Sequence, residues 1–362
     1  MMKKTLVLKV DPQRPELDKI RLAANLIRKG DLVAFPTETV YGLGADAFNP
    51  KAVLKLFKAK RRPLDNPPIV HVADSESVWP LAKEVSPSAQ RLMEQFWPGP
   101  LTLILKRSEL VPDMTVAGLD TIAVRMPKHN VALALIRESG CPVAAPSANL
   151  AGKPSPTSAE HVSADLDGRI DAVLDAGPTV VGIESTVLDM TVDPPEVLRP
   201  GGTTYELLES FLGEVKLNPI AVADKSLSLE KVKSPGLKHK HYAPDADVVV
   251  VEGRLPAVVA KVNALARNYR FRGRKVGVLS TDETKQEYTA DIVKSLGSRD
   301  DLASVARNLF RLLRDFDNAG VDIIIAEAVP AEGLGLAVMN RLRKAAGYKI
   351  VRAELPARTQ TE

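Results

Sequence analysis

Short apolar strands alternate with amphipathic helices along the chain, and this alternation constrains the fold more than any other feature. In the first part of the sequence the expected strands are 32–36, 68–72, 101–106, 121–125, 142–146, 172–175 and 186–190. Helices are expected at 17–30, from Pro50 to about 60, and at 87–96, 129–139 and 158–166. Strands mixed with helices in this way indicate an α/β sheet domain that ends near residue 212.

From residue 246 the alternation becomes more regular. Strands are expected at 246–251, 275–280 and 321–327, and helices at 256–269, 301–317 and 335–346. This order is typical of a small, parallel, Rossmann-like domain. A chain of 362 residues is long enough for two domains, and prolines, serines and lysines dominate the stretch between them. We therefore expect domains at 1–212 and 246–362, joined by a linker at 213–245.

Composition excludes several classes of protein. The net charge of +4, from 49 basic and 45 acidic residues, does not favour a nucleic-acid coat, although a local basic cleft is compatible with it. The single cysteine, Cys141, excludes an internal disulfide and a cysteine-based metal cluster, and its apolar neighbours favour a buried structural thiol. No apolar run approaches the ~20 residues of a membrane span, and Met1–Lys4 has no signal-peptide core behind it. We expect a cytoplasmic protein without membrane contact.

The segment Phe35–Asp46 follows an apolar strand and contains hydroxyl groups and two glycines. We expect a polar turn there, at which a ligand can approach the backbone. The next helix ends in a cationic cluster that includes Lys60 and Arg62, and these side chains could bind phosphates. The alternative is a solvated helix end that the macrodipole favours. A polar turn followed by fixed cations is typical of a pocket for an anionic ligand.

Polar residues also stand at the ends of other strands. Arg125 ends an apolar strand, so its charge needs a partner, either a carboxylate ligand or an internal acid. Ser147 and Asn149 follow strand 142–146, where they either point into a cleft or cap a helix. Ser185 and Arg199 repeat the pattern, which strengthens the prediction of one shared site.

Signatures of other chemistry are missing. There is no GxxxxGK[ST] phosphate loop and no complete GxGxxG, and Gly333–Gly335 is better explained as a tight turn. His239 and His241 are two residues apart and lack the cysteine or carboxylate support of a metal site. His71 lies in an apolar strand, where a hydrogen-bonded core histidine is the default interpretation.

Taken together, these motifs resemble the Sua5/YrdC family, in its two-domain Sua5 type, the threonylcarbamoyl-AMP synthases. The resemblance runs from about 18 to 204 and extends to 244. The motifs that carry it are Pro36-Thr37-Glu38-Thr39-Val40-Tyr41-Gly42-Leu43, Lys60-Arg61-Arg62, Ser147-Ala148-Asn149, Ser185-Thr186-Val187, Arg199-Pro200-Gly201, Ser234-Pro235-Gly236 and His241-Tyr242-Ala243-Pro244. It implies a twisted mixed sheet domain of the YrdC type followed by a smaller Rossmann-like α/β domain.

The resemblance also implies an activity. Such enzymes make L-threonylcarbamoyl-adenylate from L-threonine, bicarbonate or CO2, and ATP, and release pyrophosphate in the first step of t6A modification of tRNA. By family pattern, the threonine site would consist of Thr39, His71, Arg125, Ala145 and Ser185. The nucleotide would be held by Arg62, Asn66, Thr121, Ser147, Ser155, Arg199 and His241. Lys60 and Asn149, with Arg62 and Ser147, would complete the catalytic set.

Such a reaction needs positioning and charge neutralisation more than a protein nucleophile. Mg²⁺ is expected to accompany ATP, and the product is expected to pass to the tRNA threonylcarbamoyl transfer machinery. His241 and Tyr242 lie in the linker, which suggests a lid over the site. Two alternatives are an RNA-binding module with a basic cleft and a carbamoyltransferase-type enzyme. Sparse aromatic residues (4%) weaken the first, and the absence of zinc-finger cysteines weakens the second, while direct tRNA binding stays open.

Overall fold

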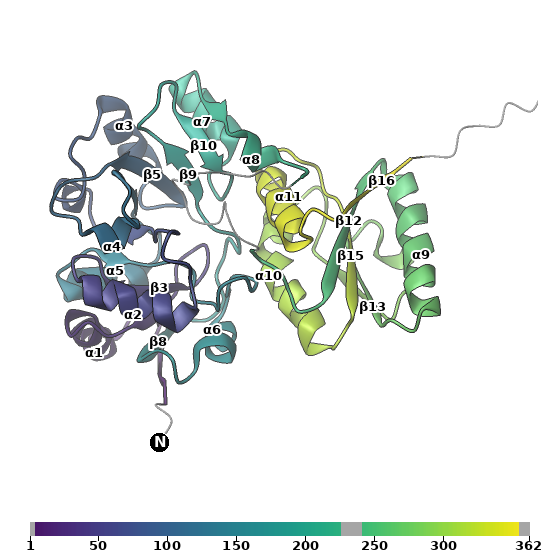
Figure 1. The fold of residues 1–362 in the computed structure, drawn as a ribbon, viewed down its shortest axis with the longest axis horizontal. Helices are drawn as coiled ribbons and strands as arrows, with labels where there is room; N and C mark the ends of the chain where they lie inside the picture. Colours follow the sequence, from purple (N-terminus) through teal and green to yellow (C-terminus); the bar gives the residue numbers. More distant parts are fainter. Residues whose placement is uncertain (1–3, 226–240, 355–362) are drawn as a thin grey trace, which may run out of the picture. The chain divides into compact units, whose positions relative to one another are not determined.

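The computed structural model describes residues 4–225 and 241–354. They form two compact units, of which the first contains residues 4–222 and the second contains 223–225 and 241–354 (Figure 1). The linker expected at 213–245, which was also proposed as a lid, is described only in part, because 226–240 lies outside the described residues. Its beginning adds a strand and a short helix, which belong to the first unit.

The first unit contains one mixed sheet of eleven strands in the order β1-β8-β2-β3-β7-β4-β6-β5-β9-β10-β11. The strands are β1 (Leu6–Lys9), β2 (Val33–Phe35), β3 (Gly42–Asp46), β4 (Val70–His71), β5 (Leu101–Lys106), β6 (Thr121–Arg125), β7 (Val143–Ala144), β8 (Ala172–Asp175), β9 (Thr186–Asp189), β10 (Glu196–Arg199) and β11 (Lys216–Leu217). The helices are α1 (Leu17–Arg28), α2 (Pro50–Lys60), α3 (Pro87–Phe96), α4 (Asp113–Val116), α5 (Asn130–Ser139), α6 (Ala159–Leu166), α7 (Tyr205–Leu212) and α8 (Pro219–Val222).

Helices pack on both faces of this sheet. Side chains of α1 and α5 bury one face over β2, β7 and β8, with Ile20 and Leu135 packing against Phe35 and Val143. Side chains of α2, α3, α6 and α7 bury the opposite face. The amphipathic pattern of each helix accounts for this burial, since the apolar residues of α1 recur at three- and four-residue intervals.

The polar turn expected over 35–46 is only partly correct, because Gly42–Asp46 forms strand β3 antiparallel to β2. A Cβ atom at Gly44 would lie 2.8 Å from Val143 and 2.9 Å from Phe35. The glycine therefore makes room for two core side chains rather than for a ligand. Strands β1, β10 and β11 were not expected from the sequence.

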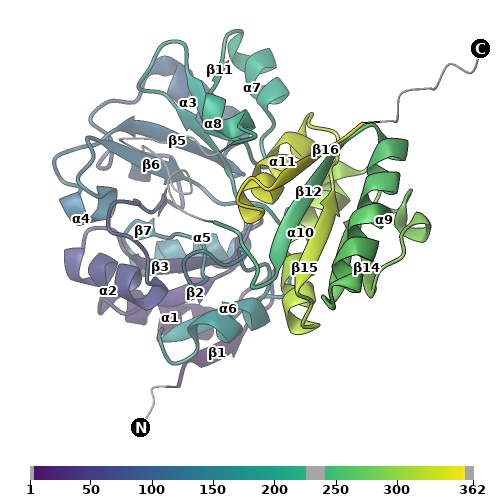
Figure 2. The same cartoon turned by 45° about the vertical axis from the view of Figure 1, so that its right-hand side comes forward.

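The second unit is a five-stranded parallel sheet in the order β14-β13-β15-β12-β16. Its strands are β12 (Asp247–Gly253), β13 (Val276–Ser280), β14 (Ile292–Ser295), β15 (Ile323–Glu327) and β16 (Ile350–Ala353). Helix α9 (Leu255–Phe271) covers one face, and α10 (Leu302–Asn318) and α11 (Leu334–Ala345) cover the other (Figure 2). The α/β class and the Rossmann-like second domain are confirmed, although the edge strands β14 and β16 were not predicted.

Candidate active site

Neighbouring strands bring several predicted residues to one face of the eleven-stranded sheet. His71 of β4 is aligned with Arg125 of β6 and with Val143 of β7. Aligned residues of paired strands project to the same side of a sheet. The ring of Phe35 meets that of His71 edge-on at 6.2 Å, which places β2 on the same side. An apolar cluster lies on the neighbouring strands. Its residues come from β5, β6, β9 and β10 and from the position just before β4: Ile69, Ile104, Ala123, Val187 and Leu198.

The backbone of residues 38–41 is hydrogen-bonded to two other segments of the site. Glu38 and Thr39 accept hydrogen bonds from the amides of Val181 and Gly182, at 2.8 and 3.1 Å. On the other side, the Ala148 amide donates to the Tyr41 carbonyl at 2.8 Å. The segment that precedes Ser185 and the loop that contains Ser147 are therefore both fixed to the same short motif.

The guanidinium of Arg125 is held on three sides. Its Nε donates to the Gly99 carbonyl at 3.1 Å, and its Nη1 donates to Thr39 Oγ1 at 2.9 Å. Its Nη2 lies 2.7 Å from Glu38 Oε1, and the two side chains are only 4% and 5% exposed. Glu38 is thus the internal acid that the sequence left as one of two possible partners. Among the described residues neither oxygen of Glu38 accepts a well-aligned hydrogen bond, so the contact is an ion pair.

His71 is buried beside this arginine. Its Nδ1 lies 3.2 Å from the Ile69 carbonyl, as expected for a core histidine with a hydrogen-bond partner. Burial, and then the positive charge of Arg125, lower the pKa of His71 to about 3. The imidazole is therefore neutral at physiological pH, and it adds no further positive charge next to the guanidinium.

Ser185 and Arg199 form a second group. The pairing of β9 with β10 shifts register between Val197 and Arg199, next to the point where Arg199 contacts Ser185. Arg199 donates from Nε to the Ser185 carbonyl at 3.1 Å and from Nη2 to Ser185 Oγ at 3.2 Å. Thr102 Oγ1 lies 2.8 Å from the same hydroxyl. These contacts join Ser185, which was predicted to bind threonine, to Arg199, which was predicted to bind the nucleotide.

Lys60 is buried rather than solvated, which excludes the helix-end alternative for this residue. Its side chain is 1% exposed, and its Nζ donates to the carbonyls of Ser147 and Asn149. Ser147 Oγ donates to Asn149 Oδ1 at 2.6 Å, and Asn149 Nδ2 donates to the Leu150 carbonyl at 2.7 Å. The next helix, α6, begins only at Ala159, so the alternative of a helix cap at 147–149 is wrong. Lys60 instead fixes this loop.

Arg62 and Asn66 are also in contact. Arg62 is half-buried, and its Nε donates to the Asn66 carbonyl at 2.8 Å. Its Nη2 donates to the Pro67 carbonyl at 3.1 Å, so the backbone that follows α2 orients the guanidinium. Asn66 Oδ1 is buried and accepts no hydrogen bond from the described residues. An unsatisfied amide oxygen at this position fits a ligand-binding role, which stays a prediction.

The other predicted residues are spread around these groups. Thr121 begins β6 and Arg125 ends it, so the two lie on one side of the strand about 13 Å apart. Ser155 Oγ donates to the buried carboxylate of Glu184. The Ala145 amide donates to the Ile69 carbonyl at 2.8 Å.

His241 belongs to the second unit, unlike every other predicted site residue. Its ring centroid lies 5.6 Å from that of Tyr242. Tyr242 in turn stacks at a tilt on Phe310 of α10, with the ring centroids 5.3 Å apart. The contacts described for His241 are therefore contacts within the second unit.

Comparison with known proteins identifies the family. A model described as "Telomere recombination" (Sua5/YciO/YrdC) matches residues 25–201, and one described as "Threonylcarbamoyl-AMP synthase, C-terminal domain" matches 203–347. The threonylcarbamoyl-AMP synthase of Pyrococcus abyssi is 52% identical over 96% of this chain and 99% of its own length. That of Bacillus subtilis is 53% identical over 94% of this chain and 95% of its own. The chain belongs to the Sua5 family.

A solved structure supports the same assignment. The crystal structure of P. abyssi Sua5 complexed with L-threonine matches this chain with a TM-score of 0.92 at 51% identity. The match covers 97% of this chain and all of that one. The fold predicted from the family resemblance, a mixed sheet domain with a second C-terminal domain, is thus confirmed.

Sequence reasoning missed several residues that contact the predicted site residues. Glu38 lies inside the motif that was singled out, but no role was given to it. The need for a counter-charge at Arg125 is the signal that could have identified it. Thr102 and Glu184 had no comparable signal, because their contacts with Ser185 and Ser155 depend on how distant strands are paired.

Glu38 also lines a cavity of about 650 Å³ in the first unit. The other walls come from residues before α1, from the loop between α3 and β5, from the start of α5 and the residues just before it, and from the loop after β8: Pro12, Gln13, Pro98, Lys128, His129, Asn130, Leu133, Ala176, Pro178, Thr179 and Val180. Glu38 therefore contacts both Arg125 and this cavity.

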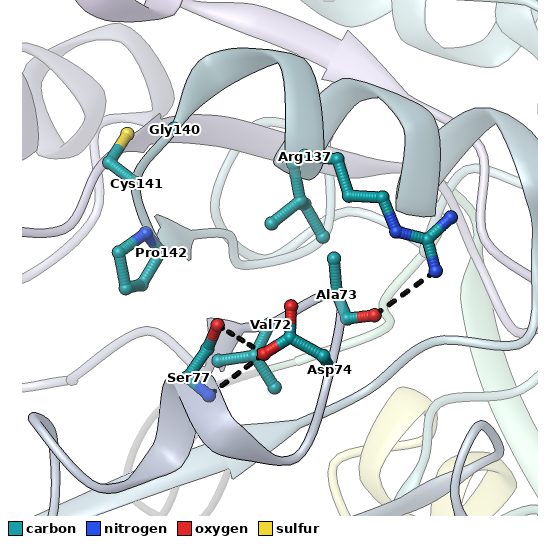
Figure 3. A pocket seen from close by; sticks show the side chains of 9 residues that line it. Val72, Ala73, Asp74, Ser77, Arg137, Gly140, Cys141 and Pro142 are labelled. Carbon is teal, nitrogen blue, oxygen red and sulfur yellow. Dashed lines mark hydrogen bonds between the residues drawn. The ribbon is translucent and has the colours of Figure 1, made fainter.

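A smaller hollow of about 280 Å³ lies between β4 and α5 (Figure 3). Arg137 donates to the Ala73 carbonyl at 3.3 Å, and Asp74 accepts from the amide of Ser77 at 2.8 Å. Cys141 lines the hollow, and burial raises the pKa of its thiol to about 12, so it stays protonated. None of the predicted site residues lines this hollow, which separates it from the candidate active site.

The described residues contain no group of three or more His, Cys, Asp or Glu side chains that could hold a metal ion. In the described part of the chain, no helix combines the length and apolar character that crossing a membrane requires.

Proposed function

We propose that this chain is an L-threonylcarbamoyl-adenylate synthase that uses L-threonine, bicarbonate or CO2, and ATP. The main observation is the buried Arg125, held by Thr39, Glu38 and Gly99 on the same sheet face as His71. A fixed guanidinium in a buried polar site is suited to the carboxylate of an amino acid. The crystal structure of the P. abyssi relative was obtained with L-threonine, which supports this choice of substrate.

The reaction has two steps. The amine of threonine adds to the carbon of CO2 and loses a proton, which gives a carbamate. A carbamate oxygen then attacks the α-phosphorus of ATP, and the bond to the β-phosphate oxygen breaks as pyrophosphate leaves. His71, neutral and with a low pKa, is a weak base, so its role is to orient the substrate rather than to remove a proton. The amine proton is released to solvent.

The cations and hydroxyls of the first unit would hold the nucleotide. Arg62 and Arg199 offset the charge of the phosphates, and each is oriented by backbone carbonyls that leave little conformational freedom to lose on binding. Lys60 fixes the loop of Ser147 and Asn149 by donating hydrogen bonds to the backbone carbonyls of both residues. The further nucleotide contacts that we propose are Asn66, Thr121, Ser155 and His241, and those proposed for threonine include Ala145 and Ser185.

Mg²⁺ would accompany ATP. This ion prefers oxygen ligands and is usually bound through one or two carboxylates, waters and substrate phosphates. The residues proposed for the nucleotide are cationic or neutral, and one of them, Ser155, contacts the carboxylate of Glu184. The residues therefore fit an ion that is held mainly by the phosphates. Bound there, Mg²⁺ would offset phosphate charge as pyrophosphate departs.

The product is a mixed anhydride, which water hydrolyses readily. It must therefore be consumed by a transfer reaction soon after it forms. We propose that the acceptor is the tRNA threonylcarbamoyl transfer machinery, as the family resemblance implies.

Pyrophosphate release tests the function. The purified chain is assayed with all substrates and then with L-threonine, bicarbonate, ATP or Mg²⁺ omitted in turn, while the adenylate is followed by mass spectrometry. We expect release to require each component. Release that depends on carbamoyl phosphate would instead indicate a carbamoyltransferase, and RNA binding without any pyrophosphate would indicate an RNA-binding module.

A further inference from the structure

Positive charge is concentrated in one part of the second domain. Residues 253–281 contain seven lysines and arginines and no aspartate or glutamate. Because the whole chain carries a net charge of +4, the remaining residues carry −3. Helix α9 and the segment that follows it thus carry seven positive charges without an acidic residue between them.

The end of α9 presents these charges to solvent. The helix buries Ala257, Val258, Val262 and Ala266 against the sheet of the second unit. Residues 267, 268, 270 and 271 of its last turns are exposed. Figure 2 shows α9 on the outside of the sheet of this unit. Phe271, the last residue of α9, is 93% exposed. Such exposure is unusual for a large apolar side chain.

Four side chains define what we call the α9 basic surface: Arg267, Arg270, Phe271 and Arg272. Arg267 precedes Phe271 by four residues, so the two are neighbours on the helix. Arg270 pairs with Asp291 at 3.3 Å, but Arg267 and Arg272 have no acidic partner among the described residues. The helix macrodipole favours cations at this end, but it does not explain an exposed phenylalanine between two arginines.

We propose that the α9 basic surface binds single-stranded RNA. Unpaired arginines contact phosphates without regard to sequence, and an exposed aromatic ring offers a stacking surface for a base. An acidic peptide would use the charges but not the ring. An anionic membrane would be expected to engage several exposed apolar side chains, whereas this surface has one. The inference does not depend on the proposed synthase activity, and it assigns the surface independently of the active site.

The test uses the full chain and a fluorescently labelled, unstructured RNA oligonucleotide, with anisotropy measured at several salt concentrations. The variants are R267Q/R272Q, F271A and a control pair, R14Q/K83Q, which removes two exposed cations of the first unit. We expect R267Q/R272Q to reduce the salt dependence, d log K/d log[salt], by about 1.4. We expect F271A to weaken binding about tenfold with an unchanged slope, and the control pair to change neither.

Several results would overturn the inference: no RNA binding by the unmodified chain, equal binding by all variants, or an equal loss in the control pair. Tighter binding to phosphatidylserine vesicles or to polyglutamate than to RNA would also contradict it. Pyrophosphate release from threonine, bicarbonate and ATP is expected to be the same in every variant. This readout also shows that each variant is folded, and it separates failure of the RNA inference from failure of the proposed function.

Discussion

The carboxylate of Glu38 lies 2.7 Å from the guanidinium of Arg125, and both side chains are almost fully buried. The pair joins the Pro36–Leu43 motif to the end of β6. A buried ion pair is costly to form, but removing one partner is worse, because the other charge is then left without compensation. Arg125 can therefore stay charged in the absence of substrate, ready for a second carboxylate.

Replacing Glu38 with alanine is expected to destabilise the fold by about 3–5 kcal/mol, since Arg125 would keep its charge without a counter-ion. Urea denaturation measures this loss. The double variant E38L/R125M removes both charges, and we expect it to be less destabilised than the sum of the two single variants. If the losses of the two single variants added exactly to that of the double variant, the ion pair would make no net contribution to stability.

Ser185 and Arg199 are expected to act as a unit. Arg199 donates two hydrogen bonds to Ser185, and lysine cannot reproduce this planar geometry. We expect R199K to weaken binding of a non-hydrolysable ATP analogue about tenfold and also to weaken binding of L-threonine. In a cycle with S185A, the two effects should not add. If R199K changed ATP affinity alone, the proposed coupling of the two substrate sites would be wrong.

Stability should depend on the protonation of His71. Its pKa in the folded state, about 3, lies below the ordinary value of 6.5, so the unfolded chain takes up a proton in the interval between them and the folded chain does not. The neutral histidine therefore contributes to the free energy of unfolding, and this contribution is complete above pH 6.5. It is lost as pH falls toward 3, at up to about 1.4 kcal/mol per pH unit.

This dependence is measured as the urea midpoint from pH 7.5 to pH 5, for the unmodified chain and for H71N. Asparagine does not titrate in this range. The stability advantage of the unmodified chain over H71N should therefore shrink as pH falls. If the urea midpoints of the two chains changed in parallel with pH, His71 would not be buried as a neutral imidazole.

Lys60 and Lys58 provide a matched comparison on one helix. Lys60 is buried and donates to two carbonyls, whereas Lys58 is exposed. We expect K60M to cost about 2–4 kcal/mol, because two buried carbonyls lose their donor, and to reduce ATP affinity through the 147–149 loop. K58M should change stability by no more than about 0.5 kcal/mol. Equal effects in both variants would mean that Lys60 does not support this loop.

Local patterns in the sequence predicted the kind of each site residue better than its partner. The apolar neighbours of Arg125 indicated that its charge would be buried and paired, and Glu38 satisfies that need. Which acid would do so depends on how the 37–42 motif crosses the end of β6, and this is a property of the sheet topology. Lys60 shows the same limit, since its burial depends on the loop at 147–149 packing over the end of α2.

Element prediction failed where side chains from distant segments decide the structure. Gly42 and Gly44 suggested a turn, but they lie in β3. At Gly44 the side chains of Phe35 and Val143 occupy the space that a Cβ atom would need. The register shift before Arg199 has no local sequence signal, although it lies next to the contact of Arg199 with Ser185. The long helices of the second domain were predicted well because their periodic burial is a local feature.

The most direct test of this account is calorimetric titration of L-threonine and L-threoninol, which lacks the carboxylate, into the unmodified chain and R125Q. We predict that the unmodified chain binds threonine at least about 100-fold more tightly than threoninol, and that R125Q loses this preference. Undiminished preference for threonine in a folded R125Q, or equal binding of both ligands by the unmodified chain, would contradict the claim that Arg125 receives the substrate carboxylate.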